Sequence, residues 1–176
     1  MRIYPKFILT LCFLILTLLF SACSHIVYPR GPIPVEMDKV GQINTSKEIS
    51  FVNELTESKL TLVAVKGSDK FFADFKQWTD FIIAQLGNEL QGRGVQVKPE
   101  GDYVLKISVP NLRFFWGAWA VRCIVNVQVE RSDGKWAKTY EGNNAGQSIE
   151  RAVDGAVHKV VAAIIGDPGF QRAISE

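Results

Sequence analysis

The chain has 176 residues and carries 20 lysines and arginines against 18 aspartates and glutamates. Two of the basic residues and none of the acidic ones lie in the first 22 positions, so the remaining chain is formally neutral. A neutral chain lacks the basic surplus that attracts nucleic acid, so nucleic acid is excluded as an expected partner. The roughly 130 residues after position 46 suffice for one hydrophobic core but not for two domains.

Residues 1–22 have the pattern of a signal peptide. Arg2 and Lys6 precede an uncharged apolar run over residues 7–20, which is short for a bilayer span of about 20 residues. The stretch Phe20-Ser21-Ala22-Cys23 resembles the lipobox of bacterial lipoproteins, in which a cysteine is lipidated after signal cleavage, here behind Ala22. Its first position is Phe20 where Leu, Val or Ile is usual, and an uncleaved N-terminal anchor is the alternative.

The lipobox resemblance implies that Cys23 is the lipidation site and that the protein's first partner is a membrane. Both alternatives place the rest of the chain outside the cytoplasm, because a basic N-terminus stays inside. A cysteine with two or more acyl chains is an effectively permanent anchor. Ser24 stands where an Asp would favour retention at the inner membrane. The expected location is therefore the outer membrane, facing the periplasm.

Residues 24–46 after the lipidated Cys23 are predicted to form a flexible tether. Their helix- and sheet-breaking residues are Pro29, Gly31, Pro32, Pro34 and Gly41. Fully extended, such a segment spans on the order of 70–80 Å, which would let the domain sit clear of the membrane. Alternatively, part of it lies on the domain as an extended strand, since Ile33 and Val35 alternate with prolines.

Residues 47–176 are predicted to form one periplasmic domain. Strands are expected at 47–53 and 60–65, where β-branched and aromatic residues are frequent. A helix is expected over 69–90 because its apolar residues recur at spacings of 4, 3, 4 and 4, namely Phe71, Phe75, Trp78, Ile82 and Leu86. Ser68 or Asp69 would cap this helix, and Gly92 and Gly94 would end it.

The second half of the domain is predicted to be a short strand at 95–98, a three-stranded meander and a final helix. The meander consists of strands over 102–116, 119–129 and 136–142, with Pro110 marking a bulge or a free edge. An Asp-Gly pair at 133–134 predicts its second turn. The helix begins near Ser148 and ends at Gly166, and Asp167 caps a short terminal helix.

This order of elements predicts an α+β fold. Strands and helices with one apolar face each bury those faces together as a two-layer sandwich. We expect an antiparallel or mixed sheet with two amphipathic helices packed on one of its faces.

With this order of elements, the chain resembles the YajG family of small bacterial lipoproteins. The resemblance runs from the lipobox through the helix exit Leu86-Gly87-Asn88-Glu89-Leu90-Gln91-Gly92-Arg93-Gly94-Val95, the meander and the last helix. It covers most of residues 45–176 and rests on patterns of hydrophobicity and glycine. It implies the fold and an envelope location, and no activity.

Catalytic, metal or cofactor sites are not expected. The two histidines, His25 and His158, lack partners at the fixed spacing that a metal site or a catalytic triad requires. Cys123 alternates with valines along a predicted strand, which indicates a buried thiol and not a nucleophile. The sequence therefore predicts no enzyme.

The most unusual segment is the aromatic tip of the meander, whose large rings are Phe114, Phe115, Trp116 and Trp119. Strand alternation places Phe114, Trp116 and Trp119 near one face and Phe115 on the other. In one interpretation these rings fill the core; in the other, some are exposed and contact a partner or a membrane interface. Arg113 and Arg122 flank the tip and could bind phosphate or carboxylate groups.

These features together predict a lipid-anchored envelope protein that acts as a non-enzymatic binding or assembly module. Its partner, besides the membrane, is expected to be another envelope protein. The alternative function is an auxiliary lipoprotein of an envelope transport system that handles a hydrophobic ligand or lipid. That alternative requires an apolar cavity between the two layers.

Overall fold

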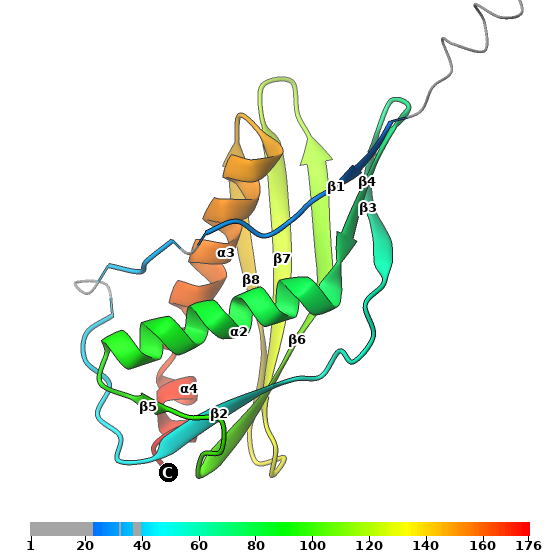
Figure 1. Cartoon of the computed structure of the whole chain (residues 1–176). Helices are drawn as coiled ribbons and strands as arrows, with labels where there is room; N and C mark the ends of the chain where they lie inside the picture. Colours follow the sequence, from blue (N-terminus) through cyan, green and yellow to red (C-terminus); the bar gives the residue numbers. More distant parts are fainter. Residues whose placement is uncertain (1–22, 32, 37–39) are drawn as a thin grey trace, which may run out of the picture.

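The computed structural model describes residues 23–31, 33–36 and 40–176. Residues 1–22, with the predicted cleavage site at Ala22, lie outside the described residues. The described part forms two mixed β-sheets and three helices (Figure 1). The predicted α+β sandwich is thereby confirmed.

The larger sheet has five strands in the order β5-β2-β6-β7-β8. β2 (Glu48–Asn53) lies parallel to both β5 (Gln96–Val97) and β6 (Tyr103–Trp116). β6, β7 (Val121–Arg131) and β8 (Ala137–Gly146) form the expected antiparallel meander. One face of β7 is buried through Val121, Cys123, Val125, Val127 and Val129. This alternation decides which side chains of β7 face the core and which face outward.

Both long helices pack on the buried face of this sheet (Figure 1). α2 (Phe75–Gly92) covers the β2 and β6 half, and α3 (Ile149–Ile165) covers β7 and β8, with α4 (Pro168–Ala173) following. α3 approaches β8 so closely that a Cβ at Gly142 would overlap the carbonyl oxygen of Ala156. No helix in the described part of the chain is both long and apolar enough to span a membrane.

The smaller sheet corrects one sequence-based prediction. It contains β1 (Ser24–Ile26), β4 (Asp69–Asp74) and β3 (Leu60–Lys66), in the order β1-β4-β3. Residues 69–74 were expected to open the first helix, but they form a strand that pairs antiparallel with β3. Gly67, with φ of +60°, makes the β3–β4 turn, and Phe71 and Ala73 alternate into the core.

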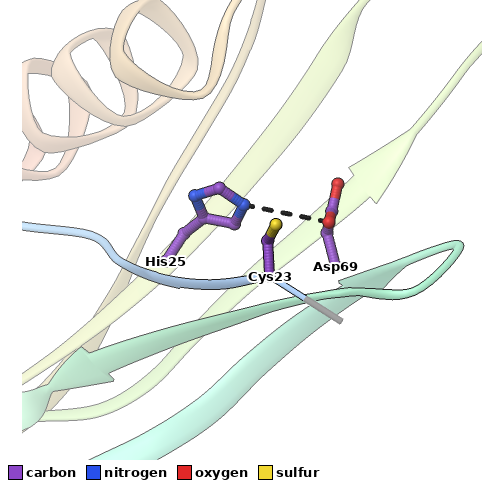
Figure 2. A group of neighbouring side chains, drawn as sticks. All are labelled: Cys23, His25 and Asp69. Carbon is purple, nitrogen blue, oxygen red and sulfur yellow. Dashed lines mark ion pairs between the residues drawn. The ribbon is translucent and has the colours of Figure 1, made fainter. Parts of the chain in front are cut away.

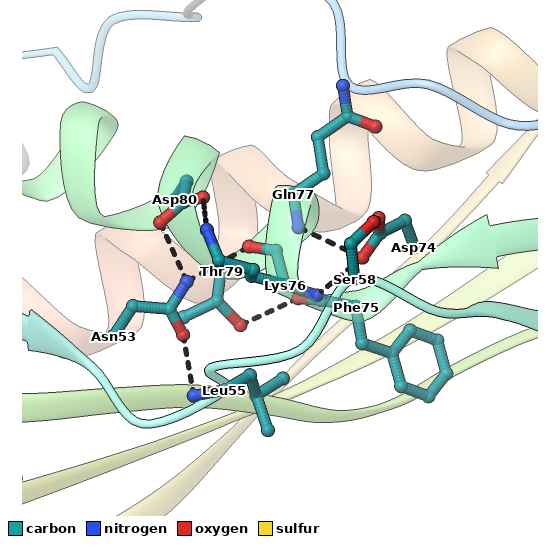
Figure 3. A network of polar contacts seen from close by, with 9 residues as sticks. All are labelled: Asn53, Leu55, Ser58, Asp74, Phe75, Lys76, Gln77, Thr79 and Asp80. Atoms are coloured by element: carbon teal, nitrogen blue, oxygen red, sulfur yellow. Dashed lines mark hydrogen bonds and ion pairs between the residues drawn. The ribbon is translucent and has the colours of Figure 1, made fainter.

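Asp74 sets the start of α2 six residues later than expected. Its Oδ1 accepts hydrogen bonds from the backbone amides of Lys76 (2.9 Å) and Gln77 (3.3 Å), as Figure 3 shows. The Ser58 hydroxyl donates to the other oxygen of Asp74. This hydroxyl, together with the backbone amides, lowers the pKa of Asp74. An N-cap that satisfies two free amides is the strongest local signal for where a helix begins.

The expected bulge at Pro110 is present. β6 runs through Pro110 without ending, and its register with β7 shifts between Ser108 and Asn111. The Val109 amide, next to this shift, donates to the Thr79 hydroxyl of α2 at 3.0 Å. The side chain of the helix thereby satisfies a buried donor beside the bulge.

The segment predicted to be a flexible tether is instead packed on the domain. We call the described part of residues 27–43 the strap. α2 binds its carbonyl groups at two points: Trp78 Nε1 donates to Val27 (3.1 Å), and Gln85 Nε2 donates to Ile33 (2.9 Å). Val35, Val40 and Ile43 are buried in the core. The alternative in which this segment lies on the domain describes the structure better.

A buried ion pair at the end of α2 explains why the strap stays in place. Glu89 and Arg93, only 7% and 2% exposed, form an i,i+4 salt bridge. Glu89 Oε1 accepts from the Val35 amide at 2.9 Å, and the Arg93 guanidinium donates to the carbonyls of Val35 (2.9 Å) and Val40 (3.1 Å). The prolines and glycines of the strap prevent it from pairing as a strand of a sheet. The ion pair instead supplies hydrogen-bond partners for its backbone amide and carbonyl groups.

Replacing Asp74 with alanine should lower the free energy of unfolding by about 1 kcal/mol, because two amides of the first turn lose their acceptor. Urea denaturation followed by circular dichroism measures this change. Glu57→Ala, an exposed acid in the preceding loop, is the matched control and should stay within about 0.5 kcal/mol of the parent. Equal stability of the two variants would contradict the capping role.

Replacing Glu89 with alanine should destabilise the domain by about 3–5 kcal/mol, because the Arg93 charge is left buried without its partner. The Val35 amide also loses its acceptor, so peptides covering 33–36 should exchange amide hydrogens faster. Hydrogen–deuterium exchange with mass spectrometry detects this. The exposed loop acid Glu100 provides the control, Glu100→Ala. Unchanged exchange in the strap of Glu89→Ala would show that the pair does not hold it.

Candidate functional site

Cys23, the predicted lipidation site, lies directly on the smaller sheet. Its carbonyl oxygen accepts a hydrogen bond from the Lys70 amide at 2.9 Å, and the three residues that follow it pair with β4. Val27 then donates its amide to the Phe72 carbonyl at 2.8 Å. Cys23 itself is exposed. Its sulfur is therefore open to modification, although no free chain separates it from the domain.

Cys23, His25 and Asp69 form a small cluster at this end of β1 (Figure 2). Their ligand atoms lie within 4.8 Å of one another, and His25 Nε2 is 3.9 Å from Asp69 Oδ1. Three such groups resemble part of a zinc ligand set. A thiolate is needed for that role, and an acylated Cys23 has none. The metal and the lipid therefore exclude each other at this cysteine.

His25 is accounted for by packing. Its imidazole stacks on the ring of Phe71, with centroids 5.0 Å apart. Phe71 contacts Trp116 at 5.3 Å, and Trp116 contacts Phe114 at 6.4 Å. This row of rings runs from β1 across β4 to the end of β6. It joins the predicted lipidation site to the aromatic tip.

The aromatic tip is divided between the core and the surface. Phe114 is buried and Trp116 is half-buried, so both face inward as alternation predicts. Phe115 points outward with 48% of its surface exposed, also as predicted. Trp119 was expected on the inward face, but it lies in the β6–β7 turn and is 93% exposed. Strand alternation does not extend into a turn, which explains the error.

Two arginines surround the exposed rings. Arg122 is the cross-strand partner of Phe115, and Arg113 lies two residues before Phe115 on the same face of β6. Both are exposed, and neither forms an ion pair with any described residue. Phe115, Trp116 and Arg122 line a shallow hollow of about 490 Å³ that Ile124 and Ala145 complete. The surface combines apolar area with free guanidinium groups.

The charge of this surface has one sign. From Asn111 to Asn126 the chain contains Arg113 and Arg122 as its charged residues and no Asp or Glu. The neighbouring end of β8, residues 142–146, carries no charge. The acidic side chains nearest along these strands are Glu141, which lies opposite the uncharged Asn126, and Glu130, which lies beyond it. The aromatic end of the sheet is therefore locally basic within a formally neutral chain.

The two carboxyl groups with strongly lowered pKa values, Asp167 and Asp133, lie away from this surface and have structural roles. Burial opposes ionisation of Asp167, but hydrogen bonds from Tyr140 (2.6 Å) and Lys138 (3.0 Å) outweigh it and lower the pKa of Asp167 to about 2. Asp167 also caps α4 through the Gly169 amide. Asp133 has a pKa of about 2 because Arg131 binds it. Both carboxylates remain ionised as hydrogen-bond acceptors.

Sequence reasoning missed how the predicted sites meet. Cys23 and the aromatic tip are more than 90 positions apart, and the residue that joins them, Phe71, was assigned to a helix. The β1–β4 pairing that creates the contact is parallel and non-local. Short, regular hydrophobic patterns carry no signal for such a pairing.

No protein-family model and no curated protein matches this chain. A solved structure of an uncharacterized protein aligns with 88% of this chain and all of its own length, at 13% identity and a TM-score of 0.36. A likeness this distant carries no argument about the chain's fold or function.

The buried thiol of Cys123 should be unreactive in the folded protein. Burial raises the pKa of Cys123 to about 12, so almost no thiolate is present near neutral pH. Iodoacetamide at neutral pH should leave Cys123 unmodified in native protein and alkylate it in guanidinium chloride. Peptide mapping by mass spectrometry distinguishes the cysteines. Alkylation of Cys123 without denaturant would contradict its structural role.

Proposed function

We propose that the chain is a lipid-anchored lipoprotein of the bacterial cell envelope, acting as a non-enzymatic binding or assembly module. The observation that carries this proposal is the position of Cys23. It follows a basic, apolar N-terminal segment with a lipobox-like end, and it is exposed at the first strand of the smaller sheet. Acyl chains on this sulfur would enter the membrane without displacing any core residue.

The proposal places the folded domain directly at the membrane. The lipobox resemblance and Ser24 favour the periplasmic face of the outer membrane. The strap leaves little slack between lipid and domain, because α2 and Arg93, the residue that follows it, bind the strap from Val27 to Val40. The anchored end of the domain would then remain at the lipid surface, and its other surfaces would be available to another envelope protein.

The transport alternative gains no support from the packing. It requires an apolar cavity between sheet and helices, where a ligand would lie. The described side chains at that interface are fully buried, among them Trp78, Ile82, Val125 and Val160. Protein interiors are close-packed in general, so the complete burial of these side chains lends the transport alternative no positive support.

Replacing Cys23 with alanine should abolish lipid attachment and leave an uncleaved precursor, because the acceptor sulfur of the motif is gone. Cells are grown with an alkyne-bearing fatty acid, and the protein is examined for label and for size on a gel. Cys123→Ala is the matched control and should retain both the label and the mature size.

Two results would count against the lipoprotein proposal. One is normal processing of Cys23→Ala, which would indicate an ordinary signal peptide. The other is a parent protein that carries no label, which would favour the uncleaved anchor.

A further inference from the structure

The molecule has two exposed hairpin turns at one end. Figure 1 shows the β3–β4 turn, beside which β1 begins, at the same end as the β6–β7 turn and opposite the C-terminus. The ring of His25 stacks on Phe71, and Phe71 contacts the tilted ring of Trp116, so these two hairpins are in direct contact. The start of β1, where Cys23 lies, and the exposed Trp119 therefore share one end of the molecule.

We propose that the aromatic–arginine surface, formed by Arg113, Phe115, Trp119 and Arg122, binds the headgroup region of the membrane that holds Cys23. This inference rests on the proposed lipid anchor and adds a second, non-covalent contact to it. Trp119 and Phe115 insert between headgroups, and the two arginines bind lipid phosphates. The lipid attaches the domain, and this surface fixes its orientation.

The position of the N-terminal segment identifies a lipid surface as the occupant. The apolar residues 7–20 lie just before Cys23, so either a lipidated cysteine or an uncleaved anchor brings the membrane to this end of the domain. The strap is clamped to α2, so the domain cannot rotate freely about a long linker. The aromatic–arginine surface, which lies at this end, is therefore held at high effective concentration near the bilayer.

The chemistry of the surface also fits a headgroup region. Tryptophan is enriched at the depth where apolar chains meet polar headgroups, and Trp119 is the most exposed large apolar side chain of the described residues. Guanidinium groups bind phosphate oxygens through paired hydrogen bonds. Arg113 and Arg122 form no ion pair with a described residue. Beside Cys23, the positive charge of exposed Lys70 is offset by the negative charge of Asp69, so the basic character of this end comes from the two arginines.

The test uses the mature, lipidated protein reconstituted into vesicles of phosphatidylethanolamine and phosphatidylglycerol, with bromine on the acyl chains near the headgroup. Bromine quenches tryptophan emission only at contact. The parent protein should lose a large part of its emission, and Trp119→Phe should remove this quenchable component. Trp136→Phe is the matched control, because Trp136 packs against Phe170 of α4 at the other end of the fold; it should retain the quenching.

The arginines are tested by a double variant, Arg113→Gln with Arg122→Gln, in which neutral side chains replace both positive charges. Each basic residue near an anionic surface changes partitioning roughly fivefold, so the ratio of docked to undocked protein should fall by roughly 25-fold. The control pair, Lys135→Gln with Arg172→Gln, removes two exposed basic residues near the C-terminus. It should leave the quenching unchanged.

The outcomes separate this inference from the lipid anchor on which it rests. Mass spectrometry of the same sample reports whether Cys23 is acylated. Acylated protein whose Trp119 is not quenched would overturn the membrane contact and leave the anchor intact. Trp119 emission that changes with protein concentration but not with brominated lipid would assign the surface to self-association, and would also overturn it. If mass spectrometry finds no acyl chain on Cys23, the proposed lipid anchor is overturned, and with it the premise of this inference.

Discussion

The buried pair of Glu89 and Arg93 is the interaction on which the arrangement of the N-terminal half depends. Two charges removed from water are costly unless each is paired and fully hydrogen-bonded. Here the remaining donors and acceptors go to the backbone of the strap at Val35 and Val40. The ion pair needs the strap, and the strap, which has no ladder of its own, needs the ion pair. Strap and helix are therefore one unit, while the pairing of β1 with β4 places Cys23 itself.

Much of the fold could be predicted from local patterns. The meander, α3 and the capped α4 follow from alternation, helical spacing and turn residues, each a short-range signal. The start of α2 could not, because Phe71 and Phe72 fit a helical apolar face as well as a strand. The decision is made by Asp74, whose cap is completed by Ser58 from a loop 16 residues earlier. Periodicity identifies an apolar face, and non-local partners decide which element carries it.

The strap shows a different limit. Its prolines predict that it forms neither a helix nor the hydrogen-bond ladder of a sheet, and the structure agrees. The lack of regular structure does not mean, however, that the segment is detached from the domain. The partners that hold it, Glu89 and Arg93, have the spacing of an ordinary surface salt bridge on a helix. Their burial depends on a segment more than 50 positions away. The aromatic tip was recognised from composition alone, but its proximity to Cys23 depends on other non-local contacts, the pairing of β1 with β4 and the contact of Phe71 with Trp116.

Packing explains the inward half of the aromatic tip and leaves the outward half without a structural role. Phe114 and Trp116 complete the row of rings that ends at His25. Trp119 buries almost nothing, so it contributes little to folding, since apolar stabilisation scales with the area removed from water. Phe115 and two arginines that form no ion pair with a described residue lie on the same hairpin. A surface with this composition stabilises the domain only when something covers it. Under the proposed lipid anchor at Cys23, the bilayer would meet the domain at this end.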